Sequence, residues 1–90
     1  MSSTYRAALL GVDPDIVHKS VRLANGFRSW SDPTRELFQL GTASIEVHPY
    51  GKEWAMLVNA GSVDEVRDTV ARLGWDPAVE VTEIKPEPVR

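Results

Sequence analysis

The sequence predicts a small α+β domain with the ferredoxin-like, split βαβ order of elements, β-α-β-β-α-β, and a short extra helix at residues 33–40. Three observations predict it: a capped amphipathic helix at residues 63–73, a hairpin pattern at residues 42–60, and a second capped helix after Asp13. With 90 residues the chain has room for one hydrophobic core, so we expect a single domain at residues 1–85.

The helix at residues 63–73 has the clearest boundaries. Ser62 is placed as the N-cap and Glu65 as its capping-box partner, while Gly74 fits the left-handed position that ends a helix. Trp75 is expected to fold back onto the last turn. Apolar residues at helical spacing form one stripe: Val63, Val66, Val70 and Leu73.

A β-hairpin is predicted from two alternating segments, residues 42–48 and 52–60, which are joined by Pro49-Tyr50-Gly51. The inner face of the first strand would hold Ala43, Ile45 and Val47. The second strand is apolar on both faces: Trp54, Met56 and Val58 on one, and Ala55, Leu57 and Asn59 on the other. A central strand, or a strand covered by a partner chain, would explain this pattern.

The pattern of residues 78–84 predicts a last strand, which Pro86 ends, and the composition of residues 86–90 predicts a flexible tail.

At the N-terminal end, the pattern of residues 4–12 fits either a strand or a helix. An alternating pattern predicts a strand: Tyr5, Ala7 and Leu9. A helical stripe is also present: Tyr5, Ala8, Leu9 and Val12. The short length favours the strand; the alternative is N-terminal helices packed on a three-stranded antiparallel sheet.

Two Asp-Pro pairs predict helix starts, because aspartate is a good N-cap and proline suits the first helical position. Asp13-Pro14 precedes apolar residues at helical spacing and then Asn25-Gly26. Asp32-Pro33 precedes Leu37, Phe38 and Leu40, which suggests the short helix at residues 33–40.

Composition excludes several functional classes. The chain has no cysteine, which removes disulfides and thiolate chemistry, and no long apolar run, so we expect a cytoplasmic protein that does not enter the membrane. The net charge of −3 argues against a nucleic-acid partner, since proteins that bind nucleic acids carry a concentrated positive surface. Two aromatic residues predicted on strands, Tyr5 and Trp54, could stack bases, but Glu46 and Glu53 beside them oppose that reading.

No catalytic constellation is present, so we expect a non-enzymatic protein without a cofactor or metal. Asp13, Asp15 and His18 could share proton transfer, yet a helix N-cap and its first turn explain both aspartates. The two histidines, His18 and His48, belong to distant elements, and their spacing predicts no metal site.

Two binding functions remain. The first is a protein-interaction or regulatory module that binds a protein partner or forms a homodimer; an inhibitor or antagonist protein would be a special case. Aromatic and basic residues expected at surface or edge positions support it: Phe27, Arg28, Trp30, Arg35, Tyr50 and Trp54. In a competing interpretation, Phe27 and Trp30 simply cover the end of the core. The second function is a metabolite-sensing domain whose ligand contacts Asp13, Asp15 and His18 at the first strand–helix loop.

Overall fold

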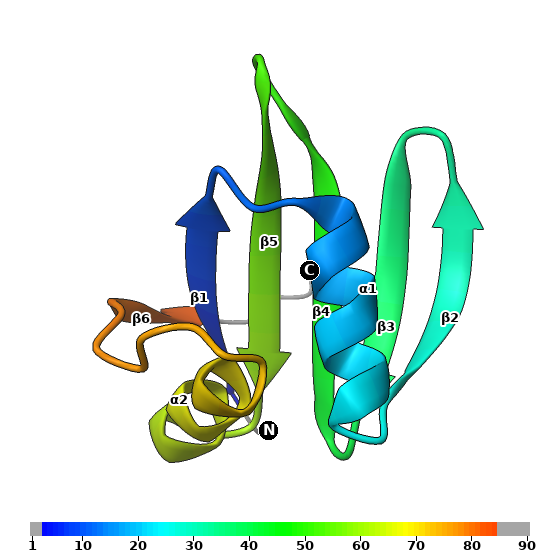
Figure 1. Ribbon diagram of the computed structural model, residues 1–90. Coiled ribbons are helices and arrows are strands. Elements are labelled where there is room, and N and C mark those ends of the chain that lie inside the picture. The colour runs from blue at the N-terminus through cyan, green and yellow to red at the C-terminus, as the bar shows by residue number, and fades with distance from the viewer. Residues whose placement is uncertain (1–2, 85–90) are drawn as a thin grey trace, which may run out of the picture.

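The computed structural model describes residues 3–84, which form six strands and two helices (Figure 1). In chain order the elements are β1 (Thr4–Leu10), α1 (Pro14–Leu23), β2 (Phe27–Asp32), β3 (Arg35–Leu40), β4 (Ala43–Tyr50), β5 (Glu53–Ala60), α2 (Val63–Arg72) and β6 (Val81–Ile84). The strands form one antiparallel sheet in the order β2-β3-β4-β5-β1-β6. Both helices cover the same side of this sheet (Figure 1).

The ferredoxin-like prediction is therefore wrong, and so is the alternative with a three-stranded sheet. Residues 4–10 form a strand, as the length argument favoured. The error lies in residues 27–40, where the hairpin β2–β3 replaces the predicted helix at residues 33–40. This hairpin adds two strands beside β4 and makes the domain mostly β.

Asp32-Pro33 opens a tight turn rather than a helix. The Oδ1 atom of Asp32 accepts hydrogen bonds from the Thr34 N–H at 2.7 Å, the Thr34 hydroxyl at 2.6 Å and the Arg35 N–H at 3.0 Å. An aspartate that binds the N–H groups ahead of it is typical of both helix starts and Asx turns, so the signature was ambiguous. Downstream, Phe38 is buried and faces the helices whereas Leu37 pairs with Glu46 on the other face, which is the period of a strand.

The structure confirms the remaining predicted elements, except that Pro49 and Tyr50, predicted in the hairpin turn, belong to β4 and the turn lies at residues 51–52. In α2, the Glu65 N–H donates to Ser62 Oγ at 3.2 Å, and the Trp75 N–H donates to the Val70 carbonyl at 3.1 Å, so the helix begins and ends as predicted. In α1, the Asp13 carboxylate caps the helix by accepting the Asp15 N–H at 2.9 Å. The last strand begins later than predicted, at the first residue of β6.

The hydrophobic core lies between the helices and the sheet. Its fully buried side chains come from both helices and from the central strands: Val17, Val21, Phe38, Ile45, Val47, Met56, Val58, Val66 and Val70. Helix α1 packs over β2 and β3, whereas α2 packs over β5 and β1. All of this burial occurs on one face of the sheet.

Strand β5 lies between β4 and β1, which confirms the prediction of a central strand. Its side chains alternate between the helix-covered face, which holds Met56 and Val58, and the opposite face, which holds Leu57 and Asn59. The predicted tail, residues 86–90, lies outside the described residues. Neither of the described helices is long and apolar enough to cross a bilayer.

Candidate functional site

The face of the sheet opposite the helices carries three rows of side chains that run across the strands. The first row contains successive partners Trp30, Leu37, Glu46, Leu57 and Ala8. The second row contains Phe27, Gln39, Ser44, Asn59, Arg6 and Thr82. The third row contains His48, Ala55 and Leu10. We call these rows, together with Asp32, Arg35, Tyr50 and Glu53 at the strand ends, the open face.

The first row is apolar except at its centre. Trp30 is 52% exposed, and Leu37, Leu57 and Ala8 are also accessible, although no residue of α1 or α2 faces them. Phe27 in the second row is 59% exposed and Leu10 in the third is 60% exposed. Large apolar side chains that stay in water over several adjacent strands are unusual in a monomer and are typical of an interaction surface.

Trp30 is held in a defined orientation. Its Nε1 donates to Asp32 Oδ2 at 3.1 Å. Hydrogen bonds from the Thr34 hydroxyl, the Thr34 N–H and Trp30 lower the pKa of Asp32 from 3.8 to about 2. The acceptor therefore stays ionised near neutral pH and holds the indole N–H, and Trp30 is the register partner of Leu37 on β3. A pre-oriented tryptophan is a good anchor, because little side-chain entropy is lost when a partner covers it.

Glu46 and His48 form the polar centre of the open face. The His48 Nδ1 lies 3.1 Å from Glu46 Oε2, and the two side chains are 28% and 29% exposed, respectively. The distance is that of an ion pair, yet the angles do not make a hydrogen bond, so Nδ1 is a buried nitrogen without a hydrogen-bond partner. Glu46 interrupts the first row, which is otherwise apolar, and His48 lies beside it in the third row.

The structure separates the residues predicted for protein binding into two groups. Phe27, Trp30, Arg35 and Tyr50 belong to the open face, and Tyr50 is 63% exposed. The interpretation that Phe27 and Trp30 cover the core does not fit their exposure.

The other two predicted residues lie on the helix-covered face. Arg28 pairs with Glu36 at 2.9 Å on that side of the β2–β3 hairpin. Trp54 packs against the core, and its carbonyl accepts the N–H groups of Gly11 and Val12. Sequence reasoning missed Leu37 as a surface residue, because the predicted helix hid its alternation with Phe38.

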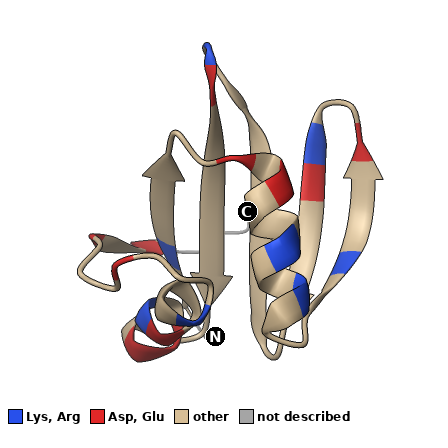
Figure 2. Ribbon diagram, viewed as in Figure 1, with Lys and Arg blue, Asp and Glu red and all other residues tan. Residues whose placement is uncertain are grey.

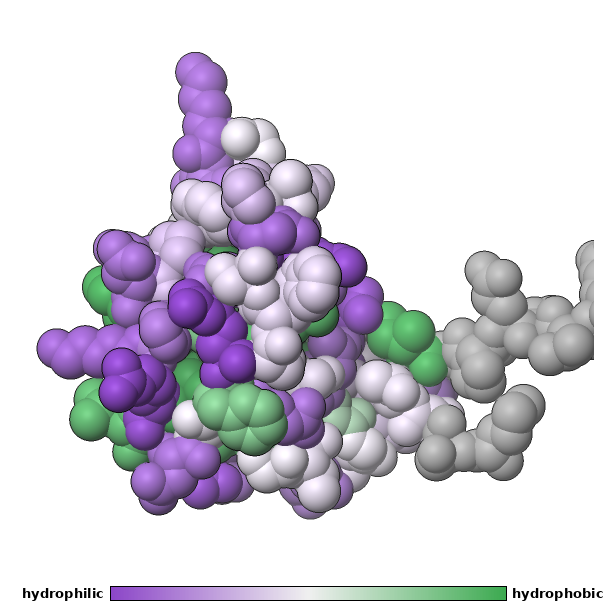
Figure 3. All heavy atoms as spheres, turned by 90° about the vertical axis from the view of Figure 1, so that its right-hand side faces the viewer, coloured by the Kyte–Doolittle hydropathy of each residue, from purple (hydrophilic) through white to green (hydrophobic). Residues whose placement is uncertain are grey.

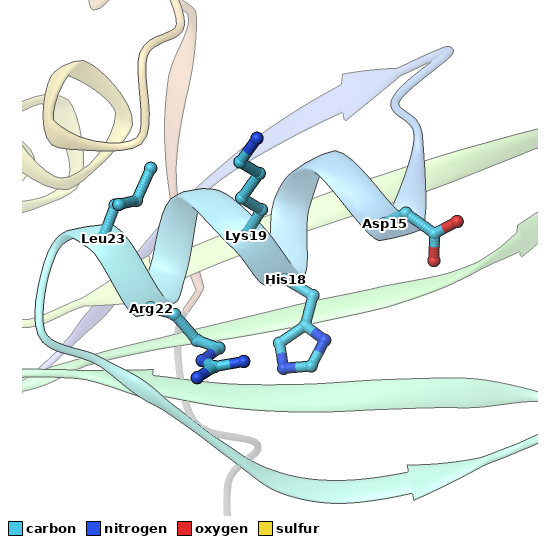
Figure 4. A pocket seen from close by; sticks show the side chains of 5 residues that line it. All are labelled: Asp15, His18, Lys19, Arg22 and Leu23. Atoms are coloured by element: carbon cyan, nitrogen blue, oxygen red, sulfur yellow. The ribbon is translucent and has the colours of Figure 1, made fainter.

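The residues of the alternative ligand site are only partly brought together. Asp13 acts as the helix cap, whereas Asp15 and His18 join Lys19, Arg22 and Leu23 along a hollow of about 460 Å³. In Figure 4, His18 and Arg22 point toward the strands under α1, while Lys19 and Leu23 point to the other side of the helix.

This hollow has no opposing wall of its own, because all of its lining residues belong to α1. The His18 ring lies 5.7 Å from the Phe38 ring, which makes it a cover for the core. Figure 2 shows acidic residues at the start of α1 and basic residues near its end. This arrangement interacts favourably with the helix dipole and stabilises the helix. Helix stability thus explains these charges without a ligand.

Comparisons with known proteins add little to this geometry. No protein-family model matches the chain, and a search of curated proteins found no match. Among solved structures, the chain is similar to the NMR structure of PA4090 from Pseudomonas aeruginosa, with 14% identity, coverage of 98% of this chain and 100% of that chain, and a TM-score of 0.44. A likeness of this size says nothing about function, so the functional argument depends on the surface itself.

Both edges of the sheet are poorly suited to strand pairing with another chain. The β2 edge carries an irregularity between Arg28 and Trp30, and the β6 edge is four residues long within the described part of the chain. Bulges and short strands are the usual protection of free edges. Seen from the β2 side in Figure 3, hydrophobic residues appear only as separate patches among hydrophilic ones. The open face is therefore a better candidate for association than either edge.

Proposed function

We propose that this protein is a non-catalytic interaction module that forms a homodimer by packing the open faces of two copies together. The observation that carries the proposal is the row from Trp30 through Leu37, Glu46 and Leu57 to Ala8, which crosses five strands, is apolar except at Glu46 and is covered by neither α1 nor α2. Two antiparallel sheets that pack face to face make a sandwich, which is a common way to bury such a surface. The open face would be the inner layer of that sandwich.

The size of the open face is adequate for a dimer. Six strands spaced about 4.8 Å apart give a width of about 29 Å, and strands of about seven residues at roughly 3.3 Å each give a height of about 23 Å. The resulting area of about 650 Å² approaches the roughly 800 Å² per partner of a standard protein interface. A homodimer covering this face would therefore fall toward the lower end of the standard size.

The charges of the open face favour a second copy over a strongly charged partner. Arg6 and Arg35 are offset by Asp32, Glu46 and Glu53, so the face is close to neutral and carries both signs. A surface with mixed charges can pair with itself in a two-fold arrangement without strong repulsion. A small domain whose hydrophobic core lies on one face of its sheet also gains stability when a second copy covers the other face.

Light scattering over a concentration series tests the proposal. We expect the wild-type protein to become dimeric as the concentration rises, and Leu57→Lys to remain monomeric because a charge would be buried in the interface. The new lysine would face Glu46 across the strands, so the monomer should still fold. Leu23→Lys is the matched control, since Leu23 is 77% exposed on α1.

The Leu23→Lys protein should dimerise like the wild type. A wild-type protein that stays monomeric at every concentration, or a Leu57→Lys protein that dimerises normally, would overturn the homodimer. A monomer that binds a different protein through Trp30 would instead identify a heterologous partner, as an antagonist protein would have.

A further inference from the structure

The Glu46–His48 pair occupies the middle of the open face. Glu46 lies on β4 between Leu37 on one neighbouring strand and Leu57 on the other. His48 follows on the same strand opposite Ala55, and its Nδ1 is 3.1 Å from the Glu46 carboxylate. Water still reaches both side chains, which are 28% and 29% exposed.

Covering the open face would remove that water. An isolated carboxylate among leucine side chains is strongly disfavoured once it is desolvated, whereas a carboxylate beside a protonated imidazole is electrically neutral as a pair. Protonation also places a positive charge on the imidazole, whose buried Nδ1 lies 3.1 Å from Glu46 Oε2, although the two atoms are not aligned as a hydrogen bond. The covered state should therefore bind a proton more tightly than the uncovered state.

We propose that homodimer formation through the open face takes up a proton at the Glu46–His48 pair, so that the dimer tightens as the pH falls through the histidine range, about 6 to 7. This inference rests on the proposed homodimer and concerns the regulation of that same surface. By linkage, a state that binds more protons is favoured at lower pH.

Four other charged side chains lie on the same face of the sheet as the pair. They are Arg35 on β3, Arg6 on β1, Glu53 at the end of β5 and Asp32 at the end of β2. Hydrogen bonds from Thr34 and Trp30 keep the pKa of Asp32 at about 2, so this residue stays ionised. Tyr50 lies at the end of β4, and the β5 residues opposite the pair, Ala55 and Leu57, carry no ionisable group.

The test is the dimer dissociation constant at pH 8.0 and pH 5.5, measured by analytical ultracentrifugation on the full chain. For the wild type we expect the constant to fall by about tenfold or more on acidification. His48→Gln should abolish this change and leave the dimer weak at both pH values. Glu46→Gln should dimerise more tightly than the wild type at pH 8.0 and should not tighten further at pH 5.5.

His18→Gln, on the helix-covered side, is the control and should keep the wild-type response. Circular dichroism establishes that each variant is folded, and Glu46→Gln keeps the test decisive if His48→Gln does not fold. A wild-type dimer with equal constants at both pH values, or a His48→Gln dimer that still tightens, would overturn the proton linkage and leave the homodimer standing. A wild type without a dimer at either pH would overturn the homodimer itself.

Discussion

The two faces of the sheet differ in what covers their apolar side chains. On the helix-covered face, Ile45 is 1% exposed and Met56 and Val58 are 0% exposed. On the open face, Phe27 and Trp30 remain 59% and 52% exposed, and polar groups such as Glu46 interrupt the apolar rows. The first face supplies the burial that stabilises the fold. The second face is not required for that core, and its composition is that of a surface suited to association.

The sharpest test of this difference uses two leucines of β3 that face opposite sides. Leu40 is 4% exposed in the core, whereas Leu37 belongs to the open face. Leu40→Ala should lower the free energy of unfolding by about 2–5 kcal/mol, the usual cost of a cavity in a core. Leu37→Ala should cost roughly 1 kcal/mol or less in the monomer. Urea denaturation at low protein concentration measures both; equal losses would show that the two faces do not differ as described.

A second test concerns the junction of α1, β2 and β3. A Cβ atom on Gly26 would lie 2.6 Å from the Gln39 carbonyl oxygen and 2.6 Å from Val21 Cγ1. Gly26→Ala should therefore destabilise the protein by about 1–3 kcal/mol, because the backbone carbonyl must move. Gly61→Ala is the control, since its nearest neighbour is 3.9 Å away and the change should be nearly neutral. Thermal unfolding compares the two, and an unaffected Gly26→Ala would contradict the close packing of the β2–β3 hairpin on α1.

The cap of α2 provides a smaller effect on the helix-covered side. Ser62→Ala removes the acceptor of the Glu65 N–H and should cost about 1 kcal/mol in urea denaturation. Ser44→Ala, an exposed change on the open face, should alter the stability of the monomer much less. A larger loss for Ser44→Ala than for Ser62→Ala would contradict the assignment of stability to the helix-covered side.

The smallest effect is the acid response of the turn that holds Trp30. The pKa of Asp32 is lowered from 3.8 to about 2 by hydrogen bonds from Thr34 and Trp30. Because the folded state holds the proton less tightly than the unfolded state, this contribution is present above pH 3.8 and is lost as the pH falls toward 2. Asp32→Asn should remove that part of the acid dependence of unfolding, whereas Asp68→Asn on α2 should leave it unchanged. An Asp32→Asn protein with the full wild-type dependence would show that these hydrogen bonds do not stabilise the turn.

Elements whose boundaries are set by neighbouring residues in the chain were predicted from the sequence. Capping residues such as Ser62 and Asp13 act within one turn, so both long helices were predicted correctly. Asp32-Pro33 is equally local but serves helix starts and turns alike, and the spacing of Leu37 and Leu40 fits a short helix as well as a strand. Only pairing with β4, a tertiary contact, decides the outcome.

The residues of the open face were predicted from the sequence only in part. Phe27 and Trp30 were predicted as candidate surface aromatics between two helices, with core cover as the competing interpretation, whereas the structure places both on β2. Trp54 was grouped with them, yet the structure places it toward the core. A strand that is apolar on both faces does not reveal which face the helices will cover, because that depends on the handedness of the connections.

The most direct test of the central claim is an isotope-filtered NOE experiment on a mixture of labelled and unlabelled protein, which detects contacts between copies only. We predict intermolecular NOEs from the Leu37 and Leu57 methyl groups and the Trp30 indole, and none from Leu23 on α1. Intermolecular NOEs confined to the helices or to the β2 edge would contradict the account, as would the absence of any intermolecular NOE at concentrations where light scattering shows a dimer.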